Sequence, residues 1–143
     1  MVGIELSKAF DCLPRELLLF KLKAYGLSED SVKFLATYLG NWFQSVKTGD
    51  TYSTWLSLCK GVPQGSVLGP LLFNIFLNDL LLLPTNSNIN SYADDTHQPF
   101  LHGLNPITTQ TTLQSDLTLV SDWFQANGMT TNPSKMPPYV VWN

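Results

Sequence analysis

The chain has 143 residues, of which 44% are hydrophobic and 13% are charged. This length fits one domain with a core of its own, and the composition excludes a disordered chain. A formal net charge of -3 at pH 7 is wrong for a self-sufficient nucleic-acid binder, which needs a surplus of basic side chains to neutralise phosphates.

The sequence also argues against secretion and against a membrane span. Residues 1–15 lack an apolar core behind a basic start, so no signal peptide is predicted. The most apolar stretch, Pro70 to Leu83, is too short to cross a bilayer and is interrupted by polar residues. Cys12 and Cys59 have neither CxxC spacing nor a nearby histidine, so we interpret them as reduced thiols, although a disulfide between them stays open. These features favour an intracellular protein, in the nucleus or the cytoplasm.

The first half of the chain is predicted to contain two capped helices. Pro14 suits the first turn of a helix that runs to about Tyr25 and is closed by Gly26. Ser28 is expected to cap the next helix, which Gly40-Asn41 ends. The other elements predicted in this half are the end of a buried strand at residues 2–6 and two strands, 42–48 and 51–59, around Thr48-Gly49-Asp50.

The second half is predicted to contain two further helices and a second hairpin. A loop at residues 61–65 leads into an apolar helix from about Ser66 or Val67 to Leu81. The elements expected after it are strands Asn88 to Tyr92 and Thr96 to Leu101, a helix from Thr109 to Asn127 ended by Gly128, and short strands Met129 to Thr131 and Tyr139 to Trp142. Together these elements predict one α+β domain in which helices pack on one antiparallel sheet.

Tyr92-Ala93-Asp94-Asp95 places two adjacent carboxylates at the tip of the second predicted hairpin. Their charges repel each other unless a cation neutralises them, and hard divalent ions such as Mg²⁺ prefer carboxylate oxygens. The pair is therefore a candidate metal site. The alternative is an ordinary solvated turn, because Asp favours turns for local reasons.

The segment from Gly61 to Pro70 forms a tight Gly/Pro-punctuated loop that opens directly into the apolar helix. Glycine lets backbone approach another molecule closely, and Gln64 offers both hydrogen-bond donors and acceptors. This pattern predicts a binding loop at Gln64-Gly65. A plain connecting loop is the alternative.

A third candidate is the segment Glu5-Leu6-Ser7-Lys8-Ala9-Phe10-Asp11, in which a strand end places one carboxylate and an aromatic ring follows five residues later. By itself this segment favours the alternative, a charged strand terminus beside a core phenylalanine.

In this order and spacing, the three segments resemble the palm of a reverse transcriptase. The resemblance is to jockey-like non-LTR retrotransposons in particular, and it lies in the amino-acid sequences of Leu6 to Asp11, Gly61 to Phe76 and Tyr92 to Asp95. A fourth block, which comprises Trp123-Phe124, Asn127-Gly128-Met129 and Asn132-Pro133-Ser134-Lys135, resembles the segment that follows the catalytic hairpin. The resemblance covers almost the entire chain, so residues 1–143 are interpreted as a partial reverse transcriptase domain from the palm region.

The resemblance implies an RNA-directed DNA polymerase that joins a primer 3′-hydroxyl to a deoxynucleoside triphosphate on an RNA template. It implies two Mg²⁺ ions, with Mn²⁺ as an alternative, held by Glu5, Asp94 and Asp95 and by the backbone carbonyl of Leu6. No membrane partner is expected, and protein partners stay unknown.

The resemblance also assigns roles to four other residues. Phe10 corresponds to the ring that stacks under the sugar, while Gln64 and Gly65 would contact the nucleotide and the template strand. Lys135 matches a lysine that protonates the departing pyrophosphate, and its alternative is a solvated loop cation.

Position 5 departs from the family pattern, because Glu stands where the family has Asp. The longer side chain would displace the carboxylate by about one methylene, and a shift of about 1 Å at a reacting centre can cost on the order of 10²-fold in rate. The fingers that bind the triphosphate and the thumb that grips the duplex are expected to lie mostly outside these residues. The basic residues are interpreted as scattered over a solvated surface: Lys8, Arg15, Lys21, Lys23, Lys33, Lys47, Lys60 and Lys135.

These features predict that the isolated chain is weakly active or inactive as an enzyme. The alternative function is a non-catalytic retrotransposon remnant that at most binds nucleic acid or protein. A further alternative is a fragment that does not fold stably alone.

Overall fold

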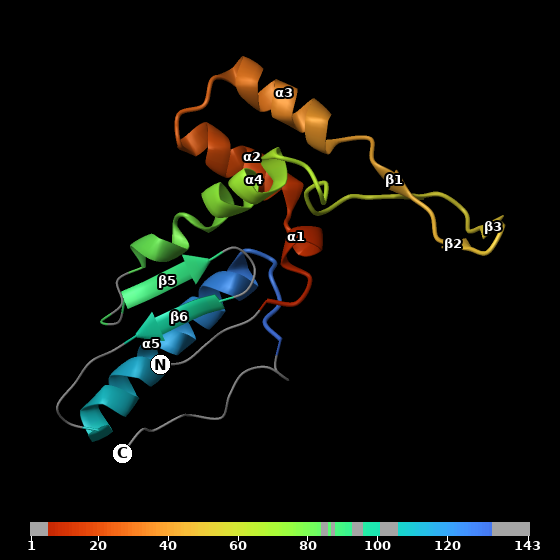
Figure 1. Ribbon diagram of the computed structural model, residues 1–143. Helices are drawn as coiled ribbons and strands as arrows, with labels where there is room; N and C mark the ends of the chain where they lie inside the picture. Colours follow the sequence, from red (N-terminus) through yellow and green to blue (C-terminus); the bar gives the residue numbers. More distant parts are fainter. Residues whose placement is uncertain (1–5, 84–85, 87, 93–95, 101–105, 133–143) are drawn as a thin grey trace.

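The computed structural model describes residues 6–83, 86, 88–92, 96–100 and 106–132, and these residues form an α+β fold (Figure 1). Its helices are α1 (Ala9–Cys12), α2 (Arg15–Ala24), α3 (Glu29–Leu39), α4 (Leu68–Leu77), the 3-10 helix η1 (Leu80–Leu82) and α5 (Pro106–Ala126). Its strands are β1 (Phe43–Gln44), β2 (Lys47–Thr48), β3 (Thr51–Tyr52), β4 (Leu56–Ser57), β5 (Asn88–Tyr92) and β6 (Thr96–Phe100).

Local capping signals set the ends of α2 and α3, as the sequence predicts. Gly26 adopts a φ of 94°, and the backbone N–H of Leu27 then reaches back to the carbonyl of Leu22 at 3.1 Å. The Ser28 hydroxyl accepts a hydrogen bond from the backbone N–H of Ser31 at 3.3 Å, which satisfies a free donor of the first turn of α3.

The apolar helix is shorter than predicted. It was expected to reach Leu81, but α4 ends at Leu77, and the chain continues after Asp79 as the 3-10 helix η1. The ammonium of Lys21 explains the change, because it holds both the carbonyl of Phe76 at 3.0 Å and the carboxylate of Asp79 at 2.7 Å. A carbonyl and a side chain that converge on one cation favour a tighter turn at this point.

Strands β1 to β4 form an arm that projects away from the helices (Figure 1). The sequence predicts two continuous strands here, and the structure instead has two short ladders. In one, Gln44 pairs with Leu56, and in the other Lys47 pairs with Tyr52. Two residues separate the ladders on the first side of the arm and three on the other, so the extra residue forms a bulge that interrupts the pairing.

The second hairpin and the last helix agree well with the sequence. Strands β5 and β6 are antiparallel, and Tyr92 pairs with Thr96 next to the connecting residues 93–95. Helix α5 packs against β6 and begins three residues earlier than predicted, at Pro106, since proline suits the first turn of a helix. Gly128, at a φ of 68°, follows its end as expected.

The described residues form three separate two-stranded sheets rather than the one antiparallel sheet that the sequence predicted. Two isolated bridges replace further ladders, Leu6 with Thr131 and Pro14 with Lys60. Pro14 has no N–H to donate, so the second bridge cannot extend into a sheet. The first bridge joins the end of one predicted strand to another, while the predicted strand Tyr139 to Trp142 lies outside the described residues.

One continuous core joins the four longer helices. The largest fully buried side chains are those of Phe73 and Phe76 in α4 and Phe124 in α5. The other buried hydrophobic residues are Leu6, Ala9, Leu13, Leu18, Leu22, Leu39, Val62, Leu72, Leu77, Leu80, Val120 and Met129. The core therefore fixes α1 and the loop that begins at Gly61 relative to α4.

Two smaller predictions concern the thiols and the membrane. Cys12 and Cys59 are both free, as interpreted from the sequence. Within the described residues, none of the helices combines the length and the apolar character that crossing a bilayer requires.

Among the described basic residues, which were expected on a solvated surface, Lys21 is the buried one, because it is only 8% exposed. Its ammonium lies 4.3 Å from the centroid of the Phe76 ring and 4.5 Å from that of Trp123, and it forms an ion pair with Asp79. Burial lowers the pKa of Lys21 below its ordinary value, while the hydrogen bond and the charge of Asp79 oppose this shift. The side chain ties α2 to the end of α4 and to α5.

This shift predicts how stability depends on pH. Because the pKa of Lys21 is lower in the folded chain than in the unfolded chain, the unfolded chain binds more protons between the two values, and the free energy of unfolding rises with pH there. Lys21→Met keeps the apolar stem and is expected to lose this rise. Urea denaturation at about pH 8 and about pH 10 measures it as the difference between wild type and variant. An equal pH dependence of the free energy of unfolding in both chains would contradict the lowered pKa of Lys21.

Candidate functional site

The loop at residues 61–65 is fixed directly onto α1. The backbone N–H of Gly61 donates to the carbonyl of Leu13 at 2.8 Å, and that of Val62 donates to the carbonyl of Phe10 at 2.9 Å. Gly61 has a φ of 81°, and a Cβ atom here would lie 2.8 Å from the Phe10 carbonyl oxygen. Only glycine permits this approach, so the two predicted site segments meet at their backbones.

Arg15 supports the same loop from α2. Its Nε donates to the carbonyl of Gly61 at 2.8 Å, and its Nη1 donates to the carbonyl of Leu58 at 2.5 Å. Burial lowers the pKa of Arg15 from its ordinary value, and the nearby Cys59 opposes this shift. The guanidinium therefore holds the segment that leads from β4 into the loop while it keeps its positive charge.

Gln64 and Asp11 link the loop to α1 through their side chains. The Gln64 Nε2 group donates to Asp11 Oδ1 at 2.7 Å, and both residues are exposed to solvent. Ser66 fixes the other end of the loop, because its hydroxyl donates to the carbonyl of Pro63 at 2.7 Å and accepts from the backbone N–H of Gly69 at 3.0 Å. The second of these bonds caps the first turn of α4.

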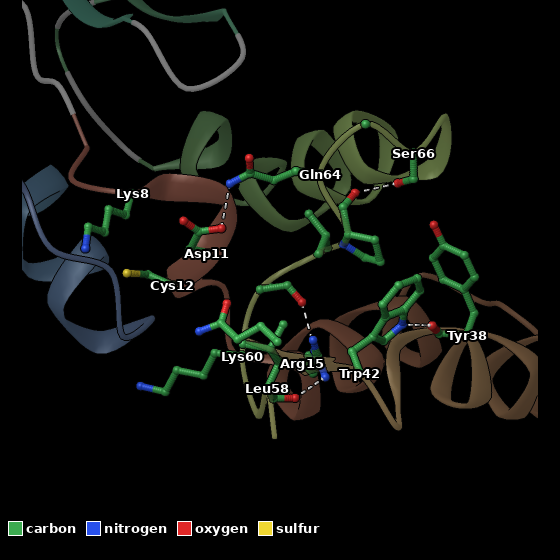
Figure 2. A pocket seen from close by; sticks show the side chains of 15 residues that line it. Lys8, Asp11, Cys12, Arg15, Tyr38, Trp42, Leu58, Lys60, Gln64 and Ser66 are labelled. Carbon is green, nitrogen blue, oxygen red and sulfur yellow. Dashed lines mark hydrogen bonds between the residues drawn. The ribbon is translucent and has the colours of Figure 1, made fainter. Parts of the chain in front are cut away.

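These contacts form one wall of an open cleft of about 950 Å³ (Figure 2). The described residues that line it include three cations, Lys8, Arg15 and Lys60, and one carboxylate, that of Asp11. The interpretation of the basic residues as scattered was therefore wrong for these three. Lys60 is far from Lys8 and Arg15 in the sequence, and it joins them because the bridge between Pro14 and Lys60 brings the end of the arm beside α1.

An aromatic residue, Trp42, also lines the cleft. Trp42 is 42% exposed, and its indole Nε1 donates to the carbonyl of Tyr38 at 2.7 Å, which fixes the ring beside α3. An exposed ring near cationic side chains can stack a base while the cations meet phosphates. The cleft thus combines the two features by which proteins hold single-stranded nucleic acid.

The structure brings together three of the predicted site residues. Gln64 and Gly65 line the cleft, and the backbone of Phe10 lies directly behind their loop. The ring of Phe10 is half-buried and packs against Phe73, with 4.7 Å between ring centroids. Leu6 is buried in the core, its backbone bridges to Thr131, and it is not among the described residues that line the cleft.

The three predicted carboxylate ligands, Glu5, Asp94 and Asp95, and the predicted proton donor, Lys135, lie outside the described residues. The described residues contain no group of three or more His, Cys, Asp or Glu side chains that could hold a metal ion. Strands β5 and β6 nevertheless pair up to Tyr92 and Thr96, on either side of the two Asp residues.

Sequence reasoning missed five members of the site: Lys8, Asp11, Arg15, Trp42 and Lys60. Asp11 stands within the quoted motif, but no role follows from the motif for its carboxylate. The grouping of the other four depends on how the end of the arm pairs with Pro14, and no local pattern signals that contact.

Comparison with known proteins decides the family. The sequence profile described as "Reverse transcriptase (RNA-dependent DNA polymerase)" matches residues 1–139. The chain belongs to this reverse transcriptase family. The resemblance found in the sequence is thereby confirmed.

The similar proteins come from non-LTR retrotransposons. The chain is 31% identical over 148 aligned positions to the probable RNA-directed DNA polymerase from transposon BS of Drosophila melanogaster, with 94% of the chain aligned. It is 27% identical over 81 positions, or 57% of the chain, to the Pol polyprotein from the type-1 retrotransposable element R2 of Popillia japonica. The chain spans 15% of the length of the first protein and 13% of the second.

Proposed function

We propose that this chain is the palm part of an RNA-directed DNA polymerase, which extends a DNA primer with deoxynucleotides on an RNA template. The observation that carries the proposal is the cleft, in which the Gln64-Gly65 loop, three cations and one exposed tryptophan face the same space. The probable RNA-directed DNA polymerase from transposon BS, to which almost the whole chain aligns, supports the same activity.

The cleft supports the part of the reaction that binds nucleic acid. Lys8 and Lys60 are exposed and can bind phosphates. Arg15 is held by two carbonyl groups and contributes its positive charge to the cleft. The net charge of -3 argues against nucleic-acid binding by the chain as a whole. The cations in the cleft can nevertheless bind phosphates, because binding depends on where the charges lie.

The second part of the proposal concerns metal ions. Glu5, Asp94 and Asp95 supply carboxylate oxygens, the donor type that Mg²⁺ and Mn²⁺ prefer, with the Leu6 carbonyl as a further oxygen ligand. Two bound ions would lower the pKa of the primer 3′-hydroxyl and neutralise the leaving pyrophosphate. Lys135 is proposed to donate a proton to that pyrophosphate, and Phe10 to pack under the sugar of the nucleotide.

A non-catalytic role in nucleic-acid binding is the second candidate, and Glu5 favours it. A carboxylate placed about one methylene too far weakens metal-assisted catalysis while leaving the cleft intact.

Primer extension on an RNA template separates the two functions. With Mn²⁺ present, the wild-type chain is expected to lengthen a labelled primer slowly, and Asp94→Ala is expected to abolish the product because it removes a metal ligand. Asp122→Ala is the matched control, since Asp122 is an exposed carboxylate on α5 outside the cleft. If the chain binds primer–template but yields no product under any of these conditions, the binding role replaces the catalytic one.

A further inference from the structure

Asp11 is the only carboxylate among the described residues that line the cleft, and its charge opposes the binding of phosphates there. It lies on α1, close to Gln64 in the loop, as Figure 2 shows. The Gln64 Nε2 group donates to Asp11 Oδ1 at 2.7 Å, although 53 residues separate the two in the sequence. This hydrogen bond suggests that the carboxylate of Asp11 serves to hold Gln64, although it lies in a cationic cleft.

The bond also determines which end of the Gln64 amide is free. An ionised carboxylate can only accept hydrogen bonds, so Asp11 can hold the NH₂ end of the amide but not its oxygen. A glutamine without such a partner can rotate its amide and present either end. With Nε2 held, the Oε1 atom of Gln64 remains for a ligand in the cleft.

We propose that Asp11 is a positioning residue that orients Gln64 so that its amide oxygen accepts a hydrogen bond from the bound nucleic acid. The proposal rests on the proposed function, because it requires a nucleic-acid strand in this cleft. The group that meets Gln64 is then a hydrogen-bond donor, either a 2′-hydroxyl of RNA or an N–H group of a base.

A double-mutant cycle tests the coupling between the two side chains. Fluorescence anisotropy with a labelled RNA–DNA primer–template gives the affinity of wild type, Asp11→Ala, Gln64→Ala and the double variant. Each single substitution is expected to weaken binding about fivefold, the effect of one hydrogen bond, and the double variant no further. Additive losses would overturn the proposal, because they would mean that the two residues act separately.

The sign of the Asp11→Ala effect distinguishes positioning from simple electrostatics. If Asp11 acted only through its charge, its removal would tighten binding to the polyanion. Asp11→Asn removes the charge but keeps an acceptor oxygen for Gln64. Its affinity for the primer–template is expected to be close to that of wild type and no lower than that of Asp11→Ala. An Asp11→Ala variant that binds as tightly as wild type, or more tightly, overturns the proposal.

A DNA template of the same sequence identifies the donor. If the Asp11→Ala loss disappears on DNA, the donor is a 2′-hydroxyl, and if it persists, the donor is a base N–H; both results support the orientation of Gln64. Absence of binding by the wild-type chain would contradict the proposed function and this role together. The side-chain amide NMR signals of Gln64 report the pair without any ligand, and they are expected to exchange faster in Asp11→Ala.

Discussion

Replacing Glu5 with Asp is expected to raise the rate of primer extension on an RNA template by on the order of 10²-fold. Both side chains offer a carboxylate, but the shorter one returns the oxygens to the position that the family pattern implies. Mg²⁺ demands near-ideal octahedral geometry, so the gain should be larger with Mg²⁺ than with the more tolerant Mn²⁺. Single-nucleotide incorporation under excess enzyme measures the change in rate.

Glu5→Gln is the matched control, because it keeps the length of the side chain and removes the negative oxygen. It is expected to lower the rate below that of wild type. If Glu5→Asp and wild type extend the primer equally fast, the residue at position 5 does not limit catalysis, and the predicted metal geometry is wrong.

Gly61→Ala is expected to destabilise the chain by about 3 kcal/mol and to detach the binding loop from α1. The left-handed backbone at this position costs an alanine about 1–2 kcal/mol. The new Cβ would also lie 2.8 Å from the Phe10 carbonyl oxygen and 2.9 Å from Asp11 Cα, and backbone atoms cannot rotate away. The loop must then move, which breaks its hydrogen bonds to Leu13 and Phe10.

Gly65→Ala separates the clash from the backbone preference. Gly65 has a similar φ of 76°, but nothing lies within 4 Å of its Cβ position, so only about 1 kcal/mol should be lost. Urea denaturation followed by circular dichroism compares the two variants. Equal losses in both would contradict the close contact between α1 and the loop.

Features with a local cause were predictable from the sequence. The Ser28 cap, the glycine at position 26 and the pairing of β5 with β6 each follow from a few neighbouring residues. The early end of α4 was not predictable, because it depends on Lys21, which lies 55 residues before Phe76. The break in the arm depends on one extra residue between two ladders, and hydrophobic patterning does not reveal register at that precision.

The candidate site also has a part that was predictable from the sequence and a part that was not. The motif pattern identified Gln64 and Gly65, and both lie in the cleft. The cationic side of the cleft was missed, since Lys8 and Lys60 come together only when the end of the arm pairs with Pro14. Glu5 and the two Asp residues of the hairpin stay predictions from the family pattern.

Incorporation of one nucleotide at a time tests most directly whether this chain copies RNA through the carboxylates of Asp94 and Asp95. Each deoxynucleoside triphosphate is supplied singly to a primer annealed to an RNA template of known sequence, with Mn²⁺ and with Asp94→Ala as the comparison. We expect the wild-type chain to add only the nucleotide complementary to the template base, and Asp94→Ala to add none. Addition regardless of the template base, or equal addition by Asp94→Ala, would contradict the claim.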